Sequence, residues 1–263
     1  MTRAIGWVVV ISTVVLAVVG PWIAADPYVL DLSQRLNGPS WVHPLGADEL
    51  GRDVLARLVV GARVSLLVGL AVVSLSATIG VTVGAVAGYA GGWVDEVSGR
   101  VMDVLLAFPG ILLAIALVAV LGPSLTHVVL ALVVIGWVGY ARLVRGQVLK
   151  LRELEYVQAA RALGARPARV LVRHIVPATL PSVTVQATLG MAAAIISEAS
   201  LSFLGLGVQP PTPSWGTMLD AGRSHLFDAP HLTVFPGLAI ALLVLGFNFV
   251  GDALRDALDP RAI

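Results

Sequence analysis

Residues 64–93 read VSLLVGLAVVSLSATIGVTVGAVAGYAGGW, a long run without a single charged side chain. A helix needs about 20 apolar residues to cross the hydrocarbon core of a bilayer. This stretch therefore predicts a membrane-spanning helix over residues 64–90, followed by a turn in its glycine-rich tail, Gly88–Gly92.

The composition of the whole chain also indicates a membrane protein. Of its 263 residues, 57% are hydrophobic and only 13% are charged, against about 25% charged in an ordinary soluble domain. The mean hydropathy is +0.91, and a soluble domain of this size could not bury that much apolar surface. A net charge of +1 does not suggest a nucleic-acid partner, and the absence of cysteine excludes disulfides, thiolate metal sites and a cysteine nucleophile.

Five further apolar runs predict five more spans, so we expect an all-α integral membrane fold with six transmembrane helices in one domain, residues 1–263. The predicted spans are residues 4–25, 64–90, 104–122, 125–146, 178–204 and 232–251. Gly122-Pro123-Ser124 joins the third span to the fourth and is too short for anything but a tight hairpin.

The loops predict the orientation. Six spans place both termini on one side, and Lys and Arg are commoner in cytoplasmic loops. With the N-terminus inside, the cytoplasmic side carries twelve Lys and Arg residues, among them Arg261, and the outer side carries five. We therefore expect an N-in/C-in topology with outer segments 26–63 and 205–231 and a cytoplasmic loop over residues 142–177.

The cytoplasmic loop predicts a helix, a turn and a second helix. Ala, Leu and Arg favour a helix over residues 155–163. Gly164 suits its C-terminal cap, and Pro167 suits the first turn of the next helix. A partner backbone could approach the small side chains of Ala159 and Ala160 closely, with nearby arginines pairing to its carboxylates. The alternative is a basic loop that simply follows the positive-inside rule.

Several segments, in the same order along the chain, resemble one family. Gln158-Ala159-Ala160, then Gly164, then Ile175-Val176-Pro177 resembles the EAA loop of ABC importer permeases. Four more stretches are similar to the C-type permease subunits of dipeptide and oligopeptide importers (the peptide/nickel family): His43–Ser65, Asp103–Pro109, Glu198–Gly207 and Gln209–Gly216.

The resemblance implies a type I permease fold that forms half of a pore. A second related permease would form the other half, two ATP-binding subunits would dock at the cytoplasmic side, and an extracytoplasmic binding protein would deliver the substrate. The implied coupling helix lies near Ala160–Arg169. The implied coupling residues are Gln158, Ala159, Ala160, Arg161, Gly164, Ala165, Arg166, Pro167, Arg169 and Pro177. Gln158 stands where the family usually has Glu, so a hydrogen bond can persist there but a charge contact cannot.

Hydrolysis of ATP is expected on other chains. A Walker A loop needs Gly-Lys-Ser/Thr, and the only lysine, Lys150, lies between Leu149 and Leu151. ATP and Mg²⁺ would therefore bind partner subunits. The histidines show no metal-ligand spacing, so no metal site or other cofactor is expected, and this chain is predicted to be a transport subunit in contact with membrane lipid rather than an enzyme.

Glu198 is the one acidic residue inside a predicted span. A carboxylate at the centre of a bilayer costs about 2.5–3.5 kcal/mol on insertion scales, and such a residue is a functional candidate by default. The alternative is a structural ion pair near the outer surface, with Arg63 as its partner.

Other candidates lie in the outer segment and in the fifth span. Asp53 and Arg57, four residues apart, predict a short amphipathic helix over residues 48–63, with Arg52 and Asp53 as docking or gating residues. Simple packing on the bundle is the alternative for that helix. Three polar residues of the fifth span are candidates for a wet pathway: Thr184, Gln186 and Thr188. The small residues of the second span either pack closely against other helices or line the pathway.

The expected function is therefore that of a permease subunit working by alternating access, for di- or oligopeptides. Nickel or another solute is the alternative cargo. A secondary transporter is a further alternative, although it would leave the cytoplasmic loop unexplained and would more often carry several ionisable residues in mid-membrane.

Overall fold

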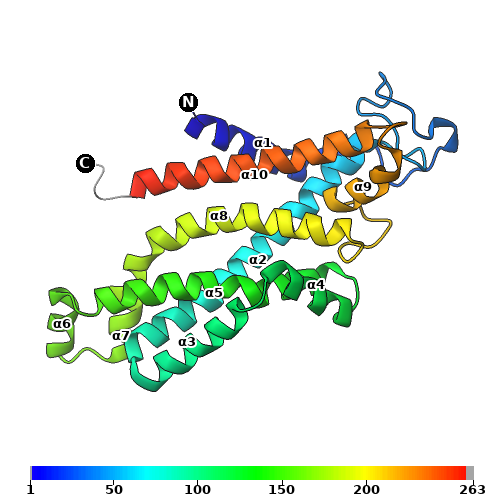
Figure 1. Cartoon of the computed structure of the whole chain (residues 1–263). Coiled ribbons are helices and arrows are strands. Elements are labelled where there is room, and N and C mark those ends of the chain that lie inside the picture. The colour runs from blue at the N-terminus through cyan, green and yellow to red at the C-terminus, as the bar shows by residue number, and fades with distance from the viewer. Residues whose placement is uncertain (1, 259–263) are drawn as a thin grey trace.

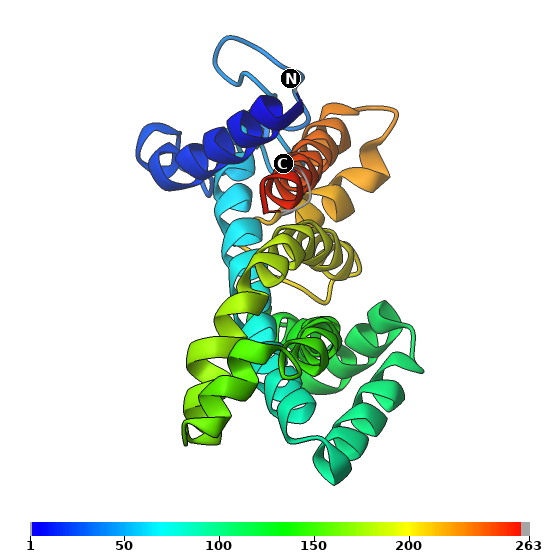
Figure 2. The same cartoon turned by 90° about the vertical axis from the view of Figure 1, so that its left-hand side faces the viewer.

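The computed structural model describes residues 2–258, and that range forms helices with no strand beyond an isolated bridge between Ala47 and Asp53 (Figures 1 and 2). The α-helices are α1 (Thr2–Ile23), α2 (Val54–Ala90), α3 (Gly92–Leu106), α4 (Gly110–Leu121), α5 (Leu125–Leu151), α6 (Glu155–Ala162), α7 (Pro167–Val170), α8 (Val176–Phe203), α9 (Trp215–Gly222) and α10 (His231–Leu258). A π-helical turn, Leu171–Ile175, joins α7 to α8, and short 3-10 helices lie at Leu32–Gln34 and Arg223–His225.

Within residues 2–258, five helical stretches are long and apolar enough to cross a membrane: α1, α2, α5, the continuous stretch Pro167–Phe203 and α10. The pair α3 and α4 makes a sixth if the two are counted as one broken span. The expected count of six is therefore reached only with this bent pair. The helices α5 and α10 run further than predicted, to Leu151 and Leu258.

The predicted third span, residues 104–122, is not one helix. Helix α3 ends at Leu106 and α4 starts at Gly110, with a bend of 83° between them. Pro109 has no N–H to donate and disfavours helical geometry at Phe108, so the helix breaks there. Pro109 therefore interrupts the helix although residues 104–122 are apolar enough to form a single span.

The second span starts earlier than predicted. Helix α2 begins at Val54 and continues to Ala90, so the expected short outer helix over residues 48–63 is instead a loop followed by the first turns of α2. The chain then turns at Gly91 and Gly92, whose φ angles are 65° and 54°. This turn lies within the predicted glycine-rich tail.

Figure 1 shows the start of α1, the end of α10 and α6 toward one end of the molecule, with α9 and the segment before α2 at the other. We call these the inner and the outer end. An ion pair of 2.7 Å between Arg3 of α1 and Asp256 of α10 joins the terminal helices at the inner end. The start of α1 and the end of α10 thus lie at the same end of the molecule, as an even number of spans requires. The side that faces the cytoplasm stays a prediction, and Arg261 lies outside the described residues.

A face of glycines on α2 packs against α5. A Cβ atom at Gly80 would lie 2.5 Å from the carbonyl oxygen of Trp137, one at Gly88 would lie 3.0 Å from that of Arg145, and one at Gly84 would overlap that of Ala141. The two backbones therefore touch over two turns of helix, as small residues allow between membrane helices. The interpretation of close packing is confirmed for this face of α2.

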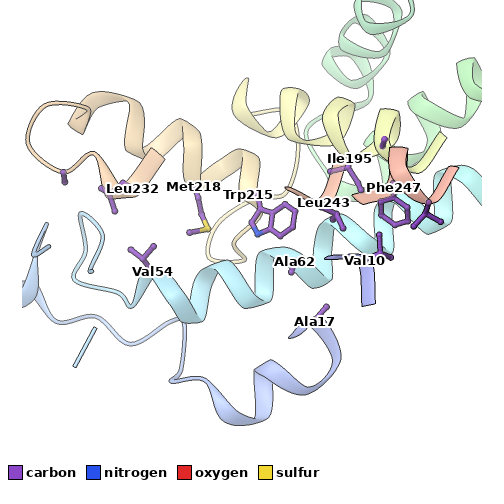
Figure 3. Packing of buried hydrophobic residues seen from close by; sticks show 13 residues of the cluster. Val10, Ala17, Val54, Ala62, Ile195, Trp215, Met218, Leu232, Leu243 and Phe247 are labelled. Carbon is purple, nitrogen blue, oxygen red and sulfur yellow. The ribbon is translucent and has the colours of Figure 1, made fainter. Parts of the chain in front are cut away.

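At the outer end, five helices share one apolar cluster (Figure 3). Ala17 of α1, Ala62 of α2, Ile195 of α8, Trp215 of α9 and Phe247 of α10 all belong to it. The indole N–H of Trp215 also donates a hydrogen bond of 2.9 Å to the carbonyl oxygen of Leu58. Helix α9 is thereby fastened to the start of α2.

Replacing Gly84 by leucine should force α2 and α5 apart. Overpacking of a tight contact costs about 1–3 kcal/mol, so the melting temperature of the purified protein in detergent and its yield should both fall. The matched control is Gly146→Leu on α5, because a Cβ at Gly146 meets nothing within 4 Å. Equal melting temperatures for the two variants would contradict the proposed packing.

Candidate functional site

The segment from α6 to α7, which we call the inner elbow (residues 155–170), has a defined turn at its centre. Gly164 has a φ of +80°. Its N–H donates to the carbonyl oxygen of Arg161 at 2.9 Å, and the N–H of Ala165 donates to that of Ala160 at 3.1 Å. This pair of bonds is a Schellman motif, and Pro167 opens α7 directly after it. The predicted helix, glycine cap and second helix are confirmed.

One face of the inner elbow is buried. Val157 of α6 and Val170 of α7 are completely buried, in a cluster with Ala85 of α2 and with Val144 and Val148 of α5. Apolar burial of this kind is the main contribution to packing of short helices. The elbow is therefore attached to α2 and α5 rather than hanging free between α5 and α8.

Polar contacts add to this attachment at the inner end of α2. The guanidinium carbon of Arg161 lies 4.7 Å from the centre of the Tyr89 ring, a cation–π contact. Arg152, just before the elbow, donates a hydrogen bond of 2.8 Å to the carbonyl oxygen of Gly88. A displacement of α6 would thus act directly on α2.

The opposite face of the inner elbow is exposed, and Leu163 at its tip keeps 88% of its surface accessible. Seven of the implied coupling residues in the elbow are exposed: Gln158, Ala159, Arg161, Gly164, Arg166, Pro167 and Arg169. Of these, Arg161 also contacts Tyr89 through its guanidinium. Ala160 and Ala165 are half-buried, and Pro177 is exposed but lies beyond the elbow in the first turn of α8. We call the exposed set the coupling surface. Its role in coupling stays a prediction.

The side-chain amide of Gln158 forms a hydrogen bond within the chain. Its Nε2 donates a hydrogen bond of 3.0 Å to the carbonyl oxygen of Glu153, across the turn between α5 and α6. An ionised glutamate accepts hydrogen bonds only, so the glutamate that is usual at this position could not make this contact. A hydrogen bond of Gln158 in place of the family's charge contact stays a prediction.

The outer segment before α2 is held by Asp48. Its carboxylate accepts from the N–H groups of Leu50 and Arg52, from Nε of Arg52 at 2.7 Å, and lies 3.3 Å from Nε of Arg57. Asp48 lies in a turn between two glycines with positive φ, Gly46 and Gly51. Its contacts join this turn to the start of α2.

Asp53 does not pair with Arg57, although the two residues lie four positions apart. Its carboxylate caps α2 by accepting the N–H of Ala56 at 2.7 Å, and it contacts Nδ1 of His43 at 2.8 Å. An N-cap side chain turns back onto the first turn of the helix, so it cannot reach along the helix to a residue four positions on. Arg52 and Asp53 thus both make structural contacts, and a docking or gating role for them stays a prediction.

Glu198 joins three helices at the outer end. It is completely buried. Its carboxylate accepts hydrogen bonds from Ser202 on α8 at 2.7 Å and from Ser65 on α2 at 3.3 Å, and the hydroxyl of Ser214, the N-cap of α9, lies beside it. Within residues 2–258 it forms no ion pair with Arg63, which is exposed. The predicted pair is therefore wrong, because serine hydroxyls meet the carboxylate instead.

The three pathway candidates separate. Gln186 lines a cavity of about 270 Å³ between α2, α4, α5 and α8. Thr184 is exposed, and its hydroxyl donates to the carbonyl oxygen of Leu180. Thr188 faces α10, where a Cβ at Gly251 would lie 2.9 Å from its hydroxyl. Gln186 and Thr184 thus face open space, whereas Thr188 packs against α10.

The same cavity holds polar residues that sequence reasoning missed, namely Ser76, Tyr140 and Ser197. Ser76 is buried, and its hydroxyl has no hydrogen-bond partner among the described residues. In the sequence it was one of many small residues in the second span, and nothing in the pattern set it apart.

Comparison with known proteins gives a consistent set of relatives. A family described as binding-protein-dependent transport system inner membrane component matches residues 80–263. The dipeptide transport system permease protein DppC of Alkalihalophilus pseudofirmus is 46% identical over 258 residues, covering 98% of this chain and 85% of the relative. The glutathione transport system permease protein GsiD of Escherichia coli O1:K1 is 50% identical over 255 residues, covering 96% of this chain and 84% of the relative.

A solved structure has the same fold. The MetNI methionine ABC transporter, in an inward-facing conformation, matches with a TM-score of 0.61 at 19% identity, over 77% of this chain and 96% of that one. At this identity the likeness concerns the fold alone.

Replacing Glu198 by alanine should loosen α9. The variant leaves buried hydroxyls without their acceptor, at about 1–3 kcal/mol for each unsatisfied group. The melting temperature and the yield of assembled complex should fall, and protease cleavage between residues 205 and 214 should increase. Ser200→Ala is the control, since the hydroxyl of Ser200 only returns to the carbonyl oxygen of Ile196. Normal assembly with altered substrate selectivity would contradict the structural role.

Proposed function

The chain belongs to the family of binding-protein-dependent transport system inner membrane components, and on that basis we propose that it is the permease subunit of an importer for short peptides. It is a transport component of an ABC importer and not itself an enzyme. The choice of peptide rests on two relatives that share about half of their residues with it over nearly its whole length, and whose names specify a dipeptide and glutathione.

The protein is a multi-pass membrane protein. We place it in the bacterial cytoplasmic (inner) membrane, with α6 and both termini on the cytoplasmic side. The description of the family as an inner membrane component supports this location. The excess of Lys and Arg in the loops at that end supports the orientation.

The chain functions together with other components of an importer. The composition that we propose is a second related permease, two ATP-binding subunits that hold ATP and Mg²⁺, and an extracytoplasmic binding protein. This chain then supplies half of the translocation pathway, and the ATP-binding subunits dock at the inner elbow.

The architecture of the inner elbow is the observation that carries this proposal. Its coupling surface is exposed and rich in arginine, whereas Val157 and Val170 on the other face are completely buried against α2 and α5. A rigid element attached in this way passes movement from one side to the other as a unit.

The mechanism that we propose on the basis of this attachment is alternating access. Closure of the ATP-binding subunits displaces the inner elbow, and the elbow carries the inner ends of α2 and α5 with it. The pathway then opens outward to receive substrate from the binding protein, and hydrolysis returns it to the inward-facing state. A secondary transporter would have no use for such an elbow.

Replacing Gly164 by proline should release the ATP-binding subunits. Proline requires a φ near −65°, whereas Gly164 has +80° and donates its N–H to Arg161. Co-purification of the ATP-binding subunit with tagged permease should fall to background, while the second permease is retained.

Gly205→Pro is the matched control for this experiment. Gly205 has a φ of +76° and donates its N–H to Ser202, but it lies at the outer end after α8. This variant should keep its ATP-binding subunits. Their retention by Gly164→Pro, or equal loss in both variants, would contradict docking at the inner elbow.

The substrate is tested by uptake into proteoliposomes that contain the complete importer and its binding protein. Labelled dipeptide should accumulate only with ATP, and excess unlabelled dipeptide or glutathione should reduce the signal at least about tenfold if they share the route. Nickel should not compete. Accumulation of nickel instead, or uptake driven by an ion gradient without ATP, would show that the peptide assignment is wrong.

A further inference from the structure

A groove between α1 and α2 combines an apolar wall with a single charged side chain. Its volume is about 440 Å³. Val18 and Trp22 of α1 form one side, Arg63 and Leu67 of α2 form the other, and Met191 and Phe247 lie on its floor from α8 and α10. Arg63 is its only charged lining residue.

Arg63 differs from the other arginines of the long helices α2 and α5. Arg57 pairs with Asp48, Arg142 with Asp103 and Arg145 with Asp95. Arg63 is exposed and makes no ion pair with any acidic side chain in residues 2–258. A cation beside an apolar groove in a membrane protein is costly unless an anion or water meets it, so the position requires a partner from outside this chain.

The level of Arg63 in the membrane follows from its neighbours. It directly precedes the uncharged run that begins at Val64, and Trp22, 81% exposed, stands one residue before the outer end of α1. Tryptophan and snorkelling arginine are typical of the membrane–water interface. From there the groove extends to Leu70, about 10 Å deeper along α2, so its apolar part lies at the depth of acyl chains.

We propose that this groove binds one anionic phospholipid of the outer leaflet. Its phosphate pairs with the guanidinium of Arg63, a geometry in which two parallel hydrogen bonds form. Its acyl chain lies between α1 and α2 and reaches Met191 and Phe247. An anionic headgroup fits better than a zwitterionic one, because the latter would bring a second cation next to Arg63.

The lipid would complete the attachment of α1. Helix α1 packs closely on α10, where a Cβ at Gly6 would lie 2.7 Å from Cβ of Phe249, and it meets α2 where Gly20 contacts Val59. Beside the contact at Gly20, the groove leaves space between α1 and α2. An acyl chain there adds apolar contact where the protein itself leaves space.

Native mass spectrometry of the assembled importer from nanodiscs tests the site. In mixed phosphatidylglycerol and phosphatidylcholine, the wild-type complex should retain phosphatidylglycerol, and Arg63→Gln should bind it about tenfold more weakly, as loss of a charged hydrogen-bond donor predicts. Arg35→Gln, at an exposed arginine of the outer segment, is the control and should bind it like the wild type. Equal retention by wild type and Arg63→Gln overturns the proposal.

A second pair of variants tests the apolar part. Leu67→Trp fills the groove and should lower lipid retention, whereas Leu75→Trp, at an exposed residue of α2 outside the groove, should not. A photoreactive p-benzoylphenylalanine at position 67 should label phospholipid. Labelling of the second permease instead would show that a protein helix occupies the groove and would overturn the proposal. These outcomes do not depend on which solute the importer carries.

Discussion

Helices α2 and α5 can touch because the face of α2 that meets α5 has no side chains at Gly80, Gly84 and Gly88. In a membrane, apolar side chains gain little by leaving lipid for one another, so close backbone approach and van der Waals contact must hold helices together. The other inner elements are attached to this pair. Helix α3 is held to α5 by the ion pairs of Asp95 and Asp103, and the inner elbow packs into the same core.

The two ends of the molecule are stabilised differently. At the outer end, the buried carboxylates of Asp48 and Glu198 are satisfied by side chains and backbone groups of the same chain. At the inner end, the elbow buries one apolar face and leaves an arginine-rich face exposed. This difference fits the proposed function, in which substrate arrives at the outer end and ATP-binding subunits act on the inner elbow.

The bend between α3 and α4 shows where pattern reasoning failed. A hydropathy average over about 20 residues does not respond to the loss of a single backbone N–H. Pro109 was nevertheless present in the sequence and indicated a break in the helix. The prediction of an ion pair between Glu198 and Arg63 was wrong for a different reason. Charge complementarity is only one way to satisfy a buried carboxylate. Ser202 lies one helical turn from Glu198, but Ser65 and Ser214 come from distant parts of the chain and were not recognisable as its partners beforehand.

The sequence by itself determined the membrane fold, the approximate spans and the helix–turn–helix of the inner elbow. Each of these depends on local chemistry: apolar length, the φ of one glycine and the ring of one proline. The tertiary structure alone decided which residues meet, such as Gly84 with α5, Glu198 with serines and Arg63 with no acidic partner among the described residues. Such contacts depend on the rotation of each helix about its axis, and packing against neighbouring helices sets that rotation, which no single stretch of sequence encodes.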